Sequence, residues 1–205
     1  MAALTTGYRA RLEDRALPAD PSTPSPRDAQ RPRDVHRALL EKWRKTMDLV
    51  GPGPVDPHFD DAEAAVGWLA ASGAWADLGS GAGFPGIMLA ETSPGATVTL
   101  VERRQKRCAF LEAVVAAAKL PNATVVCTDA AELPRAHYDG IVSRAYKAPI
   151  DMLEEGRRLL RPAGLLVLLL AREEPPVAPD FELFHVERYA VEGRPRAAVA
   201  LRFRG

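Results

Sequence analysis

The chain has 205 residues, of which 47% are hydrophobic and 26% are charged, and its 27 Lys and Arg residues balance its 27 Asp and Glu residues. This composition is typical of one globular domain with short additions, and it excludes the disordered, collagen-like and coiled-coil classes. Zero formal charge also excludes a polycationic protein, so any contact with nucleic acid must come from a local basic patch.

Targeting signals and cysteines point to the compartment. The longest apolar run, Leu165 to Ala171, is too short to span a bilayer, and the first residues lack the apolar core of a signal peptide. Cys108 and Cys127 show neither CxxC nor Cys/His spacing, so we expect two buried, reduced thiols and no metal site. We therefore expect a soluble, cytoplasmic monomer that makes no contact with membranes.

Residues 1–32 contain five prolines among polar residues and are predicted to form a mobile tail, because proline disrupts regular hydrogen bonding. Asp34 is the expected N-cap of an amphipathic helix that continues to Val50, since apolar residues recur there at helical spacing. A second helix is predicted over residues 60–72. These two helices, in residues 33–73, are interpreted as an N-terminal cap.

From residue 74 to residue 205, short apolar runs alternate with helical stretches. Continuous apolar runs indicate strands that are covered on both faces, as in the parallel sheet of an open α/β fold. The pattern predicts strands at 74–78, 97–101, 123–127, 140–143 and 165–170, helices at 85–92, 105–119 and 149–160, and a final hairpin of 181–191 and 197–203. We expect a seven-stranded, mostly parallel sheet with helices on both faces.

A glycine-rich turn follows the first of these strands. Asp77 precedes Gly79, Gly81 and Gly83, and Phe84 interrupts the turn before the next helix. Glycines let backbone N–H groups approach a ligand, and the following helix end carries partial positive charge. The GxGxG spacing departs from the GxGxxG of dinucleotide-binding proteins and resembles motif I of class I S-adenosylmethionine-dependent methyltransferases.

Two further polar positions follow the second and third strands. Glu102 ends the second strand, where its carboxylate can accept hydrogen bonds from both hydroxyls of a ribose. Residues 128–132, Thr-Asp-Ala-Ala-Glu, follow the third strand, where they can border an adenine. Taken singly, Asp77, Glu102 and Asp129 can be ordinary strand-end residues, but together with the glycines they favour a nucleoside-binding site.

Several segments resemble the glucose-inhibited division protein B family, the small-subunit ribosomal RNA methyltransferases G. They are the stretch from Asp77 to Gly86, the helix start at residues 106–111, the Ser143-Arg-Ala-Tyr146 motif, Lys42-Trp43, and His58-Phe-Asp-Asp-Ala62. The resemblance runs from about residue 34 to the C-terminus. It implies a class I methyltransferase fold over residues 74–205 and a bacterial enzyme that methylates N7 of a guanine in 16S rRNA.

The resemblance also implies which groups bind the cofactor and the substrate. We expect S-adenosylmethionine as cofactor, S-adenosylhomocysteine as product, and 16S rRNA or the small ribosomal subunit as partner. Combined with the residue patterns, it gives the expected cofactor-binding set of Asp77, Gly79, Ser80, Gly81, Gly83, Phe84, Glu102, Asp129, Ala130, Ala131, Glu132 and Arg144. The expected substrate contacts are His58, Arg103, Arg104, Lys106 and Arg107.

Arg144 is the expected catalytic residue, acting by positioning, because N7 already carries a lone pair and needs no general base. Its alternative is a structural ion pair with Asp139 or Asp77. His58 can instead be a structural histidine, Phe84 can simply line the loop–helix junction, and the basic residues that follow Glu102 can be a solvated helix start. A second basic group is expected on the polar face of the first helix, at Arg33, Arg37, Lys42, Arg44 and Lys45.

The sequence departs from the family pattern mainly on the presumed substrate side. Pro57 replaces an arginine, Val50 ends a segment that is usually Asn-Leu-Thr, Ala131 replaces a glutamate, and Ala171 replaces the lysine of a Lys-Gly pair. Alternative functions are therefore a class I methyltransferase that acts on another RNA or a small molecule, or a non-catalytic module that binds nucleosides or RNA.

Overall fold

The computed structural model describes residues 31–171 and 174–205. Most of the predicted proline-rich tail, residues 1–30, lies outside these ranges. Pro32 was predicted to belong to the tail but instead begins helix α1 (Pro32–Trp43). Proline is well suited to this position, because the first turn of a helix leaves its N–H groups without intrahelical partners.

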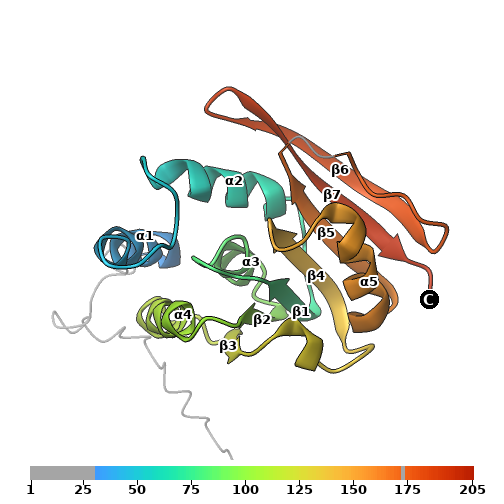
Figure 1. Cartoon of the computed structure of the whole chain (residues 1–205), viewed down its shortest axis with the longest axis horizontal. Helices are drawn as coiled ribbons and strands as arrows, with labels where there is room; N and C mark the ends of the chain where they lie inside the picture. Colours follow the sequence, from blue (N-terminus) through green and yellow to red (C-terminus); the bar gives the residue numbers. More distant parts are fainter. Residues whose placement is uncertain (1–30, 172–173) are drawn as a thin grey trace, which may run out of the picture.

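Seven strands form one sheet in the order β3-β2-β1-β4-β5-β7-β6 (Figure 1). Strands β1 to β5 are parallel, whereas β7 is antiparallel to both of its neighbours. The bounds are β1 Gly73–Leu78, β2 Ala96–Glu102, β3 Ala123–Cys127, β4 Tyr138–Arg144, β5 Leu160–Leu170, β6 Phe181–Val191 and β7 Arg194–Phe203. The predicted mostly parallel sheet and its terminal hairpin are confirmed.

Helices cover both faces of this sheet, because alternate side chains of the strands enter two separate apolar clusters. One cluster packs against α1, α2, α3 and α4, and the other packs against α5. The remaining bounds are α2 Asp56–Val66, α3 Gly86–Thr92, α4 Gln105–Ala117, α5 Pro149–Leu159 and the short 3-10 turn η1 Ala130–Glu132. Strands β1 and β4 are adjacent at the point where the strand order reverses, and ligands of open α/β sheets bind beyond the carboxyl ends there.

The two N-terminal helices differ from their predicted bounds. Arg31, rather than Asp34, occupies the N-cap position of α1, and Asp34 lies in the first turn. Helix α1 ends at Trp43, although Met47 and Val50 continue the apolar pattern and pack against the core from the following turns. Helix α2 begins at Asp56, four residues earlier than predicted.

The prediction of two reduced thiols is wrong for this structure. Cys108 of α4 and Cys127 of β3 form a disulfide, with their Cα atoms 5.7 Å apart. The two cysteines are 19 residues apart in the chain, and they meet because α4 packs beside β3. The bond fixes α4 next to the carboxyl end of β3, where Cys127 pairs in register with Glu102.

Candidate functional site

The glycine-rich turn after β1 is organised around a buried carboxylate. Asp77 is fully buried, and its Oδ2 accepts a hydrogen bond of 3.1 Å from the backbone N–H of Gly86. The other oxygen, Oδ1, has no hydrogen-bond partner among the described residues. Burial raises the pKa of Asp77 to about 6.

The path of the turn requires glycine at two positions. Gly79 has a φ of +73°, and a Cβ atom there would come within 2.6 Å of the ring of Tyr146. A Cβ atom on Gly86 would lie 2.5 Å from Oδ2 of Asp77. The turn is thereby held close to both Asp77 and the loop that follows β4. Gly79, which has no side chain, also lines a cleft in which a ligand can approach the turn.

A buried histidine, not identified from the sequence, anchors the other side of this turn. His36 of α1 is 1% exposed, and its Nε2 lies 2.7 Å from the carbonyl oxygen of Ala82. Burial lowers the pKa of His36 to about 4, so the ring is neutral near pH 7 and Nε2–H donates to the carbonyl. The ring also packs on Phe59 and Phe84. Helix α1 therefore helps to fix the turn.

Glu102 lies where the sequence predicts it, at the carboxyl end of β2 beside the glycine turn. Its Oε2 accepts a hydrogen bond of 3.1 Å from the N–H of Gly81, and its Oε1 accepts one of 2.9 Å from the N–H of Arg104. These bonds fix the direction of the carboxylate. Each oxygen retains a further lone pair that can accept a hydrogen bond from a ligand hydroxyl.

A cleft of about 420 Å³ opens above these carboxyl ends, and we refer to it as the cofactor cleft. It is lined by Gly79, Val101, Glu102, Arg103, Arg104, Arg107, Thr128, Asp129, Ala130, Ala145, Tyr146 and Lys147. The cleft thus brings together residues from all three segments predicted to bind the cofactor. It also contains three of the four basic residues that were predicted to contact substrate.

The turn that borders this cleft after β3 is held from two sides. Oδ1 of Asp129 accepts a hydrogen bond of 3.0 Å from the N–H of Ala131. From α5, Nη2 of Arg158 donates to the carbonyl oxygen of Ala130 at 2.6 Å, and Nη1 donates to that of Leu133 at 3.2 Å. The same Nη2 lies 2.7 Å from Oε2 of Glu155.

Glu155 also connects this turn to the loop after β4. Its Oε1 accepts a hydrogen bond of 2.5 Å from Nζ of Lys147. Although burial opposes ionisation, the hydrogen bonds from Lys147 and Arg158 hold the pKa of Glu155 below its usual value. A continuous chain of contacts therefore joins Lys147, through α5, to the wall formed by Ala130.

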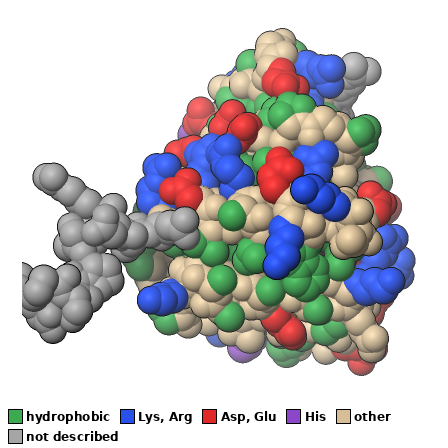
Figure 2. Space-filling view, turned by 90° about the vertical axis from the view of Figure 1, so that its left-hand side faces the viewer, with side chains coloured by type: hydrophobic (Ala, Val, Ile, Leu, Met, Phe, Trp, Pro, Cys, Tyr) green, Lys and Arg blue, Asp and Glu red, His purple; other side chains and the backbone are tan. Residues whose placement is uncertain are grey.

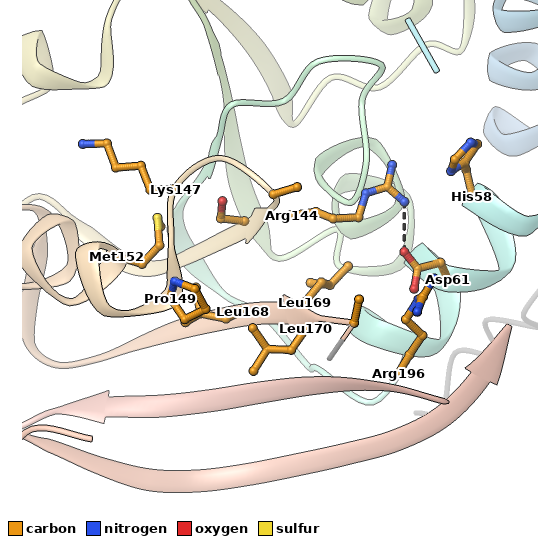
Figure 3. A pocket seen from close by; sticks show the side chains of 13 residues that line it. His58, Asp61, Arg144, Lys147, Pro149, Met152, Leu168, Leu169, Leu170 and Arg196 are labelled. Carbon is orange, nitrogen blue, oxygen red and sulfur yellow. Dashed lines mark hydrogen bonds and ion pairs between the residues drawn. The ribbon is translucent and has the colours of Figure 1, made fainter. Parts of the chain in front are cut away.

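A second pocket, of about 330 Å³, adjoins the cofactor cleft, and we call it the inner pocket (Figure 3). The two share Ala145 and Lys147 as lining residues. One wall of the inner pocket is apolar, with Pro149, Met152, Leu168, Leu169 and Leu170. The polar wall is formed by His58, Asp61, Arg144 and Arg196, which come from α2, β4 and β7.

Arg144 enters the inner pocket from the end of β4 and points toward Asp61 (Figure 3). Its Nη1 lies 2.9 Å from Oδ2 of Asp61, and the hydroxyl of Tyr189 donates to Oδ1 at 3.0 Å. The guanidinium also lies 4.9 Å from the ring centre of Phe84. The alternative that Arg144 pairs with Asp139 is wrong, because Asp139 pairs with Arg161; the partner is Asp61 rather than Asp77.

The other predicted site residues differ in whether they line one of the two pockets. Phe84 is 3% exposed and packs among His36 and Phe59, so it lines the junction between the turn and α3. Ala131 and Glu132 are exposed and do not line the cofactor cleft among the described residues, whereas Ala130 does. His58 lines the inner pocket, and burial together with the nearby Arg144 charge lowers its pKa.

The basic group predicted on α1 is largely neutralised by ion pairs. Arg33 pairs with Asp60 and Glu63, and Arg37 pairs with Asp56. Figure 2 shows the side of the molecule on which α1 lies, where acidic and basic side chains are close together rather than separated into a basic patch. Helix α1 therefore offers a weaker basic surface than the cluster beside the cofactor cleft.

Residues 31–171 and 174–205 contain no group of three His, Cys, Asp or Glu side chains arranged to hold a metal ion. Among the helices of the same residues, none has the length and apolar character required to cross a membrane.

Comparisons with known proteins identify relatives of this chain. The GidB family model, rRNA small subunit methyltransferase G, matches residues 35–176. A relative from Stenotrophomonas maltophilia, named ribosomal RNA small subunit methyltransferase G, is 38% identical over 137 residues. The match covers 64% of this chain and 64% of the relative, so it spans slightly less than two thirds of the relative's length.

Solved structures of lower identity share the fold. A variant of MtNAS in complex with S-adenosylmethionine has a TM-score of 0.59 and 14% identity, with 85% of this chain and 72% of that chain covered. A S-adenosylmethionine-dependent methyltransferase from Aquifex aeolicus has a TM-score of 0.54 and 18% identity, with 80% and 97% covered. At these identities the likeness extends to the fold alone.

Proposed function

Because this chain belongs to the rRNA small subunit methyltransferase G family, we propose that it transfers a methyl group from S-adenosylmethionine to N7 of a guanine in 16S rRNA. The observation that carries the proposal is the junction of two pockets at Ala145 and Lys147. A cofactor in one pocket and a base in the other can approach each other at that junction, beyond the carboxyl ends of β1 and β4.

The residues of the cofactor cleft fit S-adenosylmethionine, which supplies an electrophilic methyl group on a sulfonium when bound. The side-chain-poor surface at Gly79 leaves room for the ligand against Tyr146. The fixed carboxylate of Glu102 suits the two ribose hydroxyls, and Ala130 presents an apolar wall to an adenine. The buried Asp77 places negative charge beneath the turn, which favours a cationic amino acid portion above it.

The inner pocket fits a purine base. Its apolar wall of leucines, Met152 and Pro149 suits the flat face of a base, and its polar wall offers donors and acceptors for the base edges. Guanine N7 attacks with its own lone pair, so no proton has to be removed and the chain's contribution is alignment. Arg144 lines the inner pocket and is held by Asp61, which also accepts a hydrogen bond from Tyr189, so its guanidinium can donate to O6 of a guanine in this pocket, next to the reacting N7.

The test measures tritiated methyl transfer from S-adenosylmethionine to 16S rRNA and small subunits that lack the modification, followed by mass spectrometric mapping of m7G. We expect the wild-type chain to modify one guanine. For Arg144→Ala we expect kcat/KM to fall by at least about 100-fold, since a misplacement of about 1 Å at a reacting centre has this effect. Binding of S-adenosylhomocysteine, followed by calorimetry, should change far less.

Arg161→Ala is the matched control, because Arg161 forms an ion pair with Asp139 outside both pockets. It should retain wild-type turnover. Near-normal activity of a folded Arg144→Ala variant would remove the role of Arg144. If the wild-type chain binds S-adenosylhomocysteine but modifies neither RNA substrate, the 16S rRNA assignment is wrong.

A further inference from the structure

A third pocket, of about 220 Å³, continues the inner pocket away from the cofactor cleft, and we call it the outer pocket. It shares His58, Asp61 and Arg196 with the inner pocket. Its other lining residues are Pro52, Pro54, Pro57, Val191, Glu192 and Arg194. The outer pocket therefore lies between the loop that joins α1 to α2 and the turn that joins β6 to β7.

Arg196 lies at the boundary of the inner and outer pockets (Figure 3). Within residues 31–171 and 174–205 its guanidinium makes no ion pair, and Nη1 donates only to the carbonyl oxygen of Pro195, at 3.3 Å. Two carboxylates also face these pockets. The charge of Asp61 is matched by Arg144, and Glu192 is exposed at the hairpin turn. The guanidinium N–H groups of Arg196 are thus available to bind a ligand at the boundary of the two pockets.

A base that reacts inside a protein must leave its helix, and it enters the pocket with its sugar, phosphates and neighbouring nucleotides attached. The pocket for the base must therefore open into space for the RNA strand. The outer pocket supplies this space on the side opposite the cofactor cleft. Three prolines fix the backbone along its rim, so the wall loses little conformational freedom when a strand binds.

We propose that the outer pocket holds the RNA strand next to the target guanine, and that Arg196 binds a phosphate of that strand. The inference rests on the proposed function and extends it to the terminal hairpin. Guanidinium groups bind phosphate oxygens through two parallel N–H donors, and such a contact fixes the register of the strand. Arg194, exposed at the start of β7, adds positive charge on the same rim.

The experiment compares Arg196→Ala with Arg202→Ala. Arg202 lies six residues further along β7, on the same face of the strand, and its guanidinium packs over the ring of Phe184 at 4.1 Å. Binding of 16S rRNA is measured by filter retention at several salt concentrations. Methyl transfer supplies KM and kcat, and calorimetry supplies the affinity for S-adenosylhomocysteine.

For Arg196→Ala we expect KM for RNA to rise about tenfold and the slope of log affinity against log salt to become shallower by about one contact. Affinity for S-adenosylhomocysteine should stay within twofold of wild type. Arg196→Lys should keep the wild-type salt slope and recover part of the affinity, because it keeps the charge but not the paired donors. Arg202→Ala should behave as wild type.

The proposal is overturned if Arg196→Ala binds RNA with the affinity and salt slope of wild type and of Arg202→Ala. It is equally overturned if the variant loses S-adenosylhomocysteine affinity in proportion to RNA affinity, since that indicates a general structural role. Failure of the proposed function gives a different result, namely that the wild-type chain transfers no methyl group to RNA. Filter retention needs no turnover, so it still compares RNA affinity and salt slope between wild type and Arg196→Ala in that case.

Discussion

Arg158 of α5 is expected to control the cofactor cleft without contacting the ligand. Its side chain is 18% exposed and reaches the carbonyl oxygens of Ala130 and Leu133 as well as Glu155. Arg158→Ala removes these hydrogen bonds to the turn and a longer one, of 3.4 Å, to the carbonyl oxygen of Ala131. A hydrogen bond that involves a charged group contributes roughly 1.5 to 3 kcal/mol, and partial exposure reduces this value, so we expect the free energy of unfolding to fall by about 2 kcal/mol.

The same change should weaken ligand binding, because Ala130 forms one wall of the cofactor cleft. If about 1.4 kcal/mol of the loss is expressed as displacement of the turn, the affinity for S-adenosylhomocysteine falls about tenfold. Calorimetry measures that affinity, and urea denaturation measures stability. Adenosine should lose affinity by a similar factor, whereas methionine, which lacks the adenine, should not.

Arg157→Ala is the control for this prediction. Arg157 is the neighbouring residue on α5, but it pairs with Asp180 and Glu154 and does not line the cofactor cleft. Its substitution should leave S-adenosylhomocysteine affinity at the wild-type level. The reasoning about the turn is refuted if Arg158→Ala binds S-adenosylhomocysteine as tightly as wild type, or if Arg157→Ala weakens binding equally.

Two further predictions concern stability. Closing a loop of 19 residues stabilises a fold by about 3 kcal/mol, so reduction of the Cys108–Cys127 disulfide should lower the urea midpoint of unfolding. An unchanged midpoint, or two free thiols in the native protein, would contradict this prediction. Because burial raises the pKa of Asp77 to about 6, the contribution of Asp77 to stability should fall by about 2 kcal/mol as pH rises from 4 to 6. Burial lowers the pKa of His36 from 6.5 to about 4, so the contribution of His36 to stability rises with pH over the same interval. Asp77→Asn keeps the His36 contribution and loses that of Asp77, so its free energy of unfolding should rise from pH 4 to 6. If the free energy of unfolding of Asp77→Asn depends on pH as that of wild type does, the raised pKa of Asp77 is disproved.

The cofactor side of the site was predictable because its residues lie in short segments directly after consecutive strands. The GxGxG spacing and the position of Glu102 identify the turn and the strand end, and parallel strands place their carboxyl ends at one edge. The strand predictions were also accurate, because continuous apolar runs are a distinctive pattern. Strand β3 agrees at both ends, and β5 begins five residues earlier than its apolar run.

Contacts between distant segments were not predictable from these patterns. Arg144 and Asp61 are 83 residues apart, and Tyr189 is 128 residues from Asp61, so only the packing of α2 against the terminal hairpin reveals their contact. The disulfide depends on the docking of α4 against β3 rather than on cysteine spacing. His36 had no local signal beyond its place on the apolar side of a helix, because its importance comes from the carbonyl of Ala82.

The origin of each pocket explains why substrate choice can change while the cofactor site stays constant. The cofactor cleft is built from the ends of β1, β2 and β3 and the loop after β4, which share the core of the parallel sheet. The inner and outer pockets depend in addition on α2 and on the β6–β7 hairpin at the far edge of the sheet. If Arg196 binds RNA as proposed, a substitution at Arg196 can therefore alter RNA contacts without moving Glu102, whereas a substitution at Asp61 affects Arg144 directly. Under the proposed function, Arg196 is therefore the position in the hairpin where RNA recognition can be changed at the least expense to methyl transfer, whereas Tyr189 of β6 bonds to Asp61, the partner of Arg144.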